Sequence, residues 1–119
     1  SPFPDRYIVN VSSAEGSFSR DNKTGRHPHT NMAKAALNML TRTSAGLYAN
    51  SGIHMNSVDP GWITHMIAVD PSSHAELSDF TPPLDAVDGA ARIYDPVIRG
   101  IEGRPIHGLL LRNFQSVSW

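Results

Sequence analysis

The sequence predicts an α/β fold in which three strands of one parallel sheet alternate with two helices, in the order βαβαβ. Three short apolar runs each end at polar residues or glycine, and the two segments between them carry apolar residues at steps of three and four. Each connection between strands is long enough to contain a helix, as a parallel pair requires. We therefore expect residues 1–119 to form a single domain with a parallel sheet and helical crossovers.

The three predicted strands are short and rich in β-branched or other apolar residues. The first covers residues 7–11 and leads into Ser12-Ser13, and the second covers residues 53–58 and stops at Pro60-Gly61. The third covers residues 108–114, and residues 115–119 follow as a tail. We expect the terminal Trp119 to pack in a surface groove.

The first predicted helix covers residues 30–49 and ends at Asn50-Ser51-Gly52. Its apolar stripe consists of Ala33, Ala36, Leu37, Leu40, Ser44 and Leu47. The second helix is expected to begin with Thr81 as N-cap and Pro82 at the first position, and to continue through Pro96 to Gly100. Residues 14–29 lack an apolar period and are expected to form a surface loop over the site.

Charge and composition exclude several classes of function. Ten basic and eleven acidic residues give a net charge of -1, so the chain has no basic footprint for nucleic acid or for an anionic membrane. There is no run of about 18 apolar residues, as a membrane helix would need. Cysteine is absent, which excludes disulfides and thiolate metal sites and favours an intracellular, cytoplasmic location. A small, roughly neutral ligand is the expected partner.

Three motifs occur in a fixed order along the chain. Ser12-Ser13 is followed by Gly16, Lys34 lies near the start of a helix before Ala35-Ala36-Leu37, and Pro60-Gly61 follows the second strand. This order resembles the short-chain dehydrogenase/reductase family. The resemblance implies a partial Rossmann-like sheet, the C-terminal half of a doubly wound fold. It also implies hydride transfer between NAD or NADP and a carbonyl or alcohol carbon.

The resemblance assigns a role to each motif. Ser13 would orient the substrate oxygen, and Lys34 would hold the nicotinamide ribose and lower the pKa of a catalytic Tyr one helical turn earlier. The residues implied to hold the nicotinamide are Pro60, Gly61, Ile63 and Thr64. Taken alone, each motif has a structural explanation: a Ser pair that satisfies backbone groups, a solvated surface Lys, a Pro-Gly turn. Their order along the chain favours the functional interpretation.

Thr30 stands where the family has its catalytic Tyr. A Thr hydroxyl is a much weaker acid than a phenol, whose ordinary pKa is about 10, so Thr30 is a poor proton donor. Thr30 has a structural alternative as the N-cap of the helix. His27 or His29 would then be the candidate acid. These two His residues form an H-x-H pair without a third ligand in sequence, which favours a loop over a metal site.

The sequence lacks the strand and Gly-rich turn with which the family's dinucleotide-binding half begins. We therefore expect that N-terminal half to be absent from residues 1–119, and the remaining sheet to have an unpaired edge strand and one poorly covered face. The chain is expected to be completed by the missing half or by a partner chain, as an oligomer in which Met32, Met39 and Leu47 face a partner.

Two hypotheses of function remain open at this point. In the first, the chain is the substrate-side half of an NAD(P)-dependent oxidoreductase, with activity impaired by Thr30. In the second, it is a non-catalytic structural or interaction module derived from the family, within a larger assembly. The sequence indicates neither the substrate nor a choice between NAD and NADP.

Overall fold

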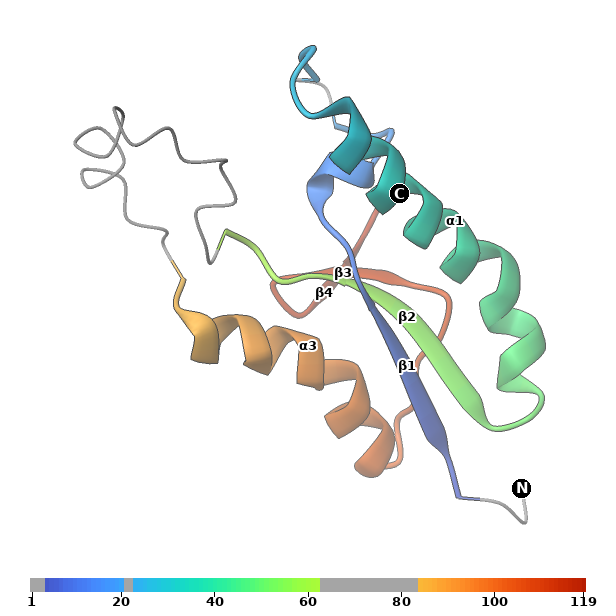
Figure 1. Cartoon of the computed structure of the whole chain (residues 1–119). Coiled ribbons are helices and arrows are strands. Elements are labelled where there is room, and N and C mark those ends of the chain that lie inside the picture. Colours follow the sequence, from blue (N-terminus) through green and yellow to red (C-terminus); the bar gives the residue numbers. More distant parts are fainter. Residues whose placement is uncertain (1–3, 21–22, 63–83) are drawn as a thin grey trace.

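The computed structural model describes residues 4–20, 23–62 and 84–119, which form an α/β fold around one sheet (Figure 1). The elements are β1 (Arg6–Val11), the 3₁₀ turn η1 (Ala14–Gly16), α1 (Pro28–Ala49), β2 (Ile53–Asp59), α3 (Ala86–Ile101), β3 (Leu110–Arg112) and β4 (Gln115–Val117). The predicted βαβαβ order is confirmed, with one further strand at the end.

The sheet has the order β1-β2-β3-β4. β1 pairs with β2 and β2 with β3 in parallel, whereas β3 and β4 form an antiparallel hairpin. The predicted strand over residues 108–114 is wrong in extent, because Asn113 and Phe114 both have positive φ and turn the chain into β4. Among the described residues, β1 pairs with β2 alone, so its other edge is open, as predicted.

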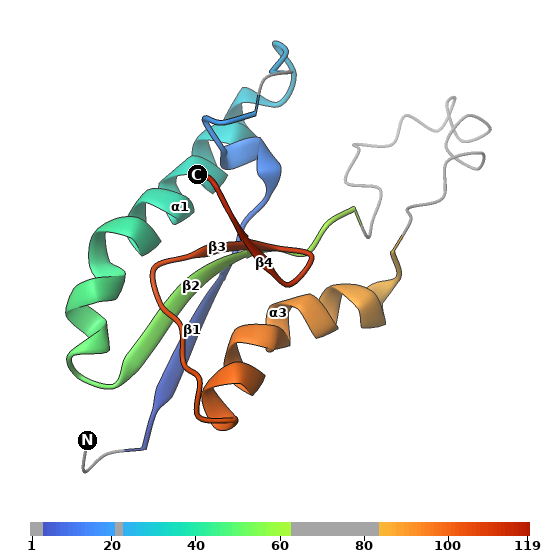
Figure 2. The same ribbon diagram turned by 180° about the vertical axis from the view of Figure 1, so that it is seen from behind.

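The two helices lie on opposite faces of the sheet (Figures 1 and 2). On β1, Asn10 donates a hydrogen bond to Thr41 of α1, whereas the ring of Tyr7 lies against Gly100 of α3. Side chains three positions apart on a strand point to opposite faces, so the two contacts are made on different sides. α3 therefore packs on the second face, although Val11, which lies on the same face of β1 as Tyr7, stays 40% exposed.

The two crossover connections between the parallel strands have opposite hands. Both crossovers, through α1 and through α3, step in the same direction across the sheet. Since their helices lie on opposite faces, the two crossovers have opposite hands, and one of them departs from the right-handed rule for parallel strands.

The buried face of α1 differs from the predicted apolar stripe. The buried residues are Asn38, Thr41 and Ala45, whereas Leu40 and Leu47 of the predicted stripe are 47% and 73% exposed. The reason lies in the strands, because the β1 and β2 positions that α1 covers carry polar side chains that need hydrogen-bond partners. Among the residues that the structure describes, the buried apolar side chains are Ala45, Met55, Val58, Leu110 and Leu111.

The start of α3 also differs from the prediction. Its N-cap is Asp85, which forms a reciprocal capping box with Asp88, so the predicted N-cap at Thr81 is wrong. Thr81 itself lies outside the described residues. The helix continues through Pro96, as predicted, with that residue buried. Trp119 is half-buried and lines a small hollow beside Phe18 and Met39, so its packing in a groove stays a prediction.

Candidate functional site

The carboxyl ends of β1 and β2 lie side by side, and Ser13, Pro60 and Gly61 follow them. Val11 and Val58 are register partners, and the Ser12 amide donates to the Val58 carbonyl over 2.8 Å. Because parallel strands end at the same edge of a sheet, Ser13 and Pro60-Gly61 emerge at one place. This edge is the candidate site.

The two neighbouring serines at the end of β1 have different environments. Ser12 is buried, and its hydroxyl donates to the Asn38 side-chain oxygen over 2.6 Å. Ser13 is half-buried and has extended backbone, and its hydroxyl oxygen accepts from the Glu15 amide over 3.1 Å. A hydroxyl that accepts one hydrogen bond keeps its own hydrogen to donate. Ser13, unlike Ser12, therefore has a hydroxyl hydrogen that no described residue accepts.

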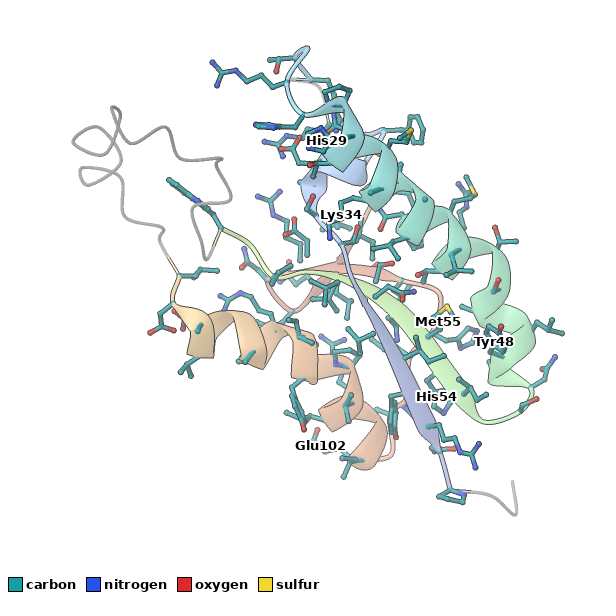
Figure 3. The ribbon with its side chains drawn as sticks, in the orientation of Figure 1. His29, Lys34, Tyr48, His54, Met55 and Glu102 are labelled. Atoms are coloured by element: carbon teal, nitrogen blue, oxygen red, sulfur yellow. The ribbon has the colours of Figure 1, made fainter. Side chains whose placement is uncertain are left out.

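Lys34 reaches from α1 to the same strand end. Figure 3 shows its side chain directed from the helix toward the end of β1, and its ammonium donates to the Val11 carbonyl over 3.0 Å. This contact lies two residues before Ser13, so the structure brings Lys34 to the Ser13 segment. An ammonium has three hydrogens to donate, and this bond uses one of them.

Thr30 lies one turn before Lys34 and on the same face of α1, since residues four apart on a helix are neighbours. Its predicted role as N-cap is wrong. The N-cap is His27, which has a left-handed backbone conformation and no capping side-chain bond, and Pro28 occupies the first helical position. The Thr30 hydroxyl is therefore not used as a helix cap.

His27 and His29 are both exposed near the start of α1, with ring centroids 6.2 Å apart. Figure 3 shows His29 at this end of the helix. It precedes Lys34 by five residues, which places the two about 140° apart around a helix of 3.6 residues per turn. Within residues 4–20, 23–62 and 84–119, no three His, Cys, Asp or Glu side chains come together as a metal site would require.

Pro60 and Gly61 follow β2 directly, and Pro60 is buried. Gly61 has φ of +83°, and a Cβ placed there would lie 2.8 Å from a methyl group of Leu84. Glycine is therefore favoured both by the backbone conformation and by the close approach of α3's leading segment. Ile63 and Thr64, the other two predicted nicotinamide contacts, lie outside the described residues.

Two residues at this site were missed by sequence reasoning. Asn38 joins the segments around the site, since it accepts from Ser12 and donates to the Gly16 carbonyl over 3.2 Å. The amide side chain one turn after Lys34, on the same helix face, was the available signal. Asp59 was missed as well, although it is the last residue of β2 before Pro60.

Asp59 is 6% exposed and ends β2, the strand that lies between β1 and β3. One carboxylate oxygen accepts from the Ala14 amide over 3.0 Å and the other from the Gly61 amide over 2.9 Å. The Arg112 guanidinium lies 3.8 Å away. A hollow of about 470 Å³ opens beside Asp59 and is lined by Ala14, Ser17, Ser19, Arg20, Asp59, Leu110, Arg112, Val117 and Ser118.

The sequence of residues 5–87 matches the family model described as enoyl-(acyl carrier protein) reductase. Over 103 residues the chain is 35% identical to an uncharacterised protein of Acanthamoeba polyphaga mimivirus, a match that covers 81% of this chain and 21% of the viral protein. The chain therefore spans about a fifth of the length of that curated relative.

Solved structures with the same fold include several that hold a nicotinamide nucleotide. The chain superposes on a Burkholderia multivorans protein described as a short-chain dehydrogenase/reductase with bound NADP (TM-score 0.60, 23% identity, 95% of this chain and 44% of that one). It also superposes on the NADPH-bound carbonyl reductase from chicken fatty liver (TM-score 0.55, 24% identity, 95% and 42%). A third match is the Pseudomonas aeruginosa RhlG/NADP active-site complex (TM-score 0.61, 21% identity, 96% and 46%). At these identities the likeness shows the fold, over less than half of each solved chain.

In the described parts of the chain, neither helix combines the length and the apolar character that a membrane span requires.

Proposed function

This chain belongs to the short-chain dehydrogenase/reductase family, and we propose that it forms the substrate-side half of an NAD(P)-dependent oxidoreductase. The complete protein would pass hydride between the nucleotide and a carbonyl or alcohol carbon. The observation that carries this proposal is the meeting of Ser13 and Lys34 at one strand end, with the Lys34 ammonium on the Val11 carbonyl.

The residues present fit the nicotinamide end of such a cofactor, which would supply or accept the hydride. Two ammonium hydrogens of Lys34 remain for ribose hydroxyls. Pro60 and Gly61 follow β2 at the same sheet edge as Ser13. In this proposal Pro60, Gly61, Ile63 and Thr64 hold the nicotinamide, and Ser13 donates its hydroxyl hydrogen to the substrate oxygen.

Proton transfer is the weak step in this proposal. Thr30 shares the Lys34 face of α1 but carries an alkyl alcohol, which neither loses nor recovers a proton readily near neutral pH. His29 points about 140° away around the helix, so it is poorly aligned with Lys34. We infer that turnover is slow, with water or Thr30 relaying the proton.

The pyrophosphate end of the nucleotide has no cradle in this chain, because no Gly-rich turn joins a strand to a helix in its sequence. We propose that the missing half, or a partner chain, supplies it by pairing with the open edge of β1. Ile8 and Val11 on this strand are 38% and 40% exposed, which is high for residues of a parallel sheet.

Nucleotide binding by the complete protein tests this function. We expect saturable quenching of protein fluorescence by NADH or NADPH, with Lys34→Ala weakening the affinity at least about tenfold, because the ribose loses a charged donor. Arg104→Ala, at an exposed cation that pairs with Glu102 beyond the end of α3, is the control and should leave the affinity unchanged. Equal affinities for Lys34→Ala and the unaltered protein would contradict the proposal.

A gain of function gives a second test. Thr30→Tyr restores a phenol one turn before Lys34 and is expected to raise kcat with a model ketone by roughly 10²-fold or more, the usual contribution of a positioned acid. His29→Ala should leave the turnover of the unaltered protein unchanged. No gain from Thr30→Tyr in a protein that binds NADPH would show that the phenol site is not intact.

The second candidate function is a non-catalytic interaction module. It is favoured by Thr30 and by the exposed apolar side chains on the outer face of α1, where Met32, Met39 and Leu47 are 72%, 54% and 73% exposed. Under this proposal the complete protein binds neither nucleotide, and Leu47→Glu changes its assembly state in analytical ultracentrifugation.

A further inference from the structure

Asp59 connects two segments that are far apart in sequence. Its carboxylate accepts the Ala14 amide on one oxygen and the Gly61 amide on the other, over 3.0 and 2.9 Å. Ala14 directly follows Ser13, and Gly61 belongs to the predicted nicotinamide segment. One side chain therefore spans the substrate side and the cofactor side of the proposed site.

The Asp59 carboxylate is buried, so it needs partners that compensate its charge. The side chain of Asp59 is 8% exposed, and a carboxylate removed from water is stable where charge-assisted hydrogen bonds and a counter-charge replace hydration. The two amides supply the hydrogen bonds, and the Arg112 guanidinium, 3.8 Å away, supplies the positive charge. Arg112 comes from β3, so three strand ends converge on Asp59.

We propose that Asp59 is a positioning residue that fixes the Ser13 segment against the Pro60-Gly61 segment. This inference rests on the proposed function, because it assigns Asp59 to the same reaction. A substrate oxygen held by Ser13 and a nicotinamide held by Gly61 react only at one mutual distance and angle, and a displacement of about 1 Å can cost on the order of 10²-fold in rate. Asp59 acts through the backbone and touches neither reactant.

An aspartate suits this role better than an asparagine of the same shape. Both carboxylate oxygens accept hydrogen bonds, whereas an amide offers one accepting oxygen and one donating nitrogen. In Asp59→Asn the nitrogen would face a backbone N–H, so one of the two segments would lose its anchor. The substitution therefore breaks the connection while it keeps the side-chain volume.

The experiment is a double-mutant cycle on the complete protein, with NADPH and a model ketone as substrates. Asp59→Asn is expected to lower kcat by roughly 10- to 100-fold. In a Ser13→Ala background the same substitution should cost less than about threefold more, because residues that act as a unit are not additive. Asp5→Asn, at an exposed carboxylate outside the site, is the matched control and should leave kcat unchanged.

Hydrogen exchange gives a readout that does not depend on turnover. In Asp59→Asn, at least one of the Ala14 and Gly61 amides should exchange faster by about tenfold or more, while the amides of β1 and β2 keep their protection. Unchanged exchange at both positions would overturn the proposal, as would equal losses of kcat in the two backgrounds. If the unaltered protein binds no NADPH and turns nothing over, the proposed function itself fails and this inference falls with it. An active protein that Asp59→Asn leaves unchanged overturns the role of Asp59 alone.

Discussion

Ser12 donates its hydroxyl hydrogen to the side-chain oxygen of Asn38 over 2.6 Å, and both side chains are buried. The bond crosses from the end of β1 to the middle of α1. The Asn38 amide then donates to the Gly16 carbonyl, so η1 is held against the helix. The neighbouring Ser13 has no part in this connection, which separates a structural serine from the proposed functional one.

The two serines should therefore respond differently to alanine. Ser12→Ala leaves the buried Asn38 oxygen without its donor and is expected to lower the free energy of unfolding by about 1–3 kcal/mol. Ser13→Ala removes a half-buried hydroxyl that accepts one local bond, and should change stability by less than about 1 kcal/mol while it lowers kcat to a small, measurable residual rate. Urea unfolding and steady-state kinetics measure the two effects. The reverse pattern would exchange the roles of the two residues.

Gly16 lies where η1 approaches α1 most closely. A Cβ at this position would lie 2.4 Å from the Lys34 carbonyl carbon and 2.6 Å from the Ala35 nitrogen, and both are backbone atoms that cannot rotate away. Gly16→Ala is expected to push η1 off the helix and to lower the free energy of unfolding by about 1–3 kcal/mol or more. Lys34 would lose its fixed relation to Ser13, so nucleotide affinity should fall as well.

Gly46→Ala is the control for this glycine effect. Gly46 lies inside α1, is exposed, and has no atom within 4 Å of the added Cβ. Alanine there removes the entropic cost of a helical glycine and should stabilise the protein by about 0.5–1 kcal/mol. A thermal melt in which Gly16→Ala also gains stability would contradict the close approach.

Thr41 is the centre of the polar contact between α1 and the sheet. Its hydroxyl is fully buried, donates to the Leu37 carbonyl over 3.0 Å and accepts from the Asn10 amide over 2.9 Å. It also lies 2.7 Å from the Ser57 hydroxyl, and Ser57 is the donor because the single Thr41 hydrogen is already used.

Thr41→Val keeps the shape and deletes this hydroxyl. The Asn10 amide and the Ser57 hydroxyl would each lose a buried partner, so we expect the free energy of unfolding to fall by about 2–4 kcal/mol. Thr43→Val, on the exposed side of the same helix, should change it by less than about 0.5 kcal/mol. Matching unfolding curves for the two variants would show that the polar contact contributes nothing.

The sequence allowed prediction of the features that depend on local signals. β1, β2 and the range of α1 follow from short apolar runs, a helical period and Gly52 after the helix. The inward face of α1 could not be predicted, because its polar residues are buried only where Asn10, Ser12 and Ser57 face them. The β3–β4 hairpin was missed because its turn is Asn113-Phe114, without the glycine that usually marks such a turn.

At the candidate site, too, residues with a local sequence signal could be predicted, and residues that act through long-range contacts could not. Ser13, Lys34 and Pro60-Gly61 were found from their linear order, which a sequence displays directly. Asn38 and Asp59 act across separations of 26 and 45 residues, to Ser12 and Ala14. Such contacts depend on strand register and helix rotation, which a single sequence does not specify.

The pH dependence of α3 gives the last prediction. The Asp88 amide donates to the Asp85 carboxylate, and this hydrogen bond is the main reason that the pKa of Asp85 lies below its ordinary value of 3.8. The folded state thus binds the Asp85 proton less readily than the unfolded state does. The stabilisation is complete above the ordinary pKa and is lost as the pH falls through the lower folded value.

Asp85→Ala should therefore destabilise the protein at pH 7, and this deficit should shrink as the pH falls below the ordinary pKa of 3.8, where the charge-dependent part of the cap is progressively lost. Asp85→Asn caps the helix without titrating, so its stability relative to the alanine variant should not depend on pH in this range. Urea unfolding of the three proteins between pH 7 and pH 3 measures both differences. A deficit of Asp85→Ala that is as large at pH 3 as at pH 7 would mean that the carboxylate charge contributes nothing to the cap.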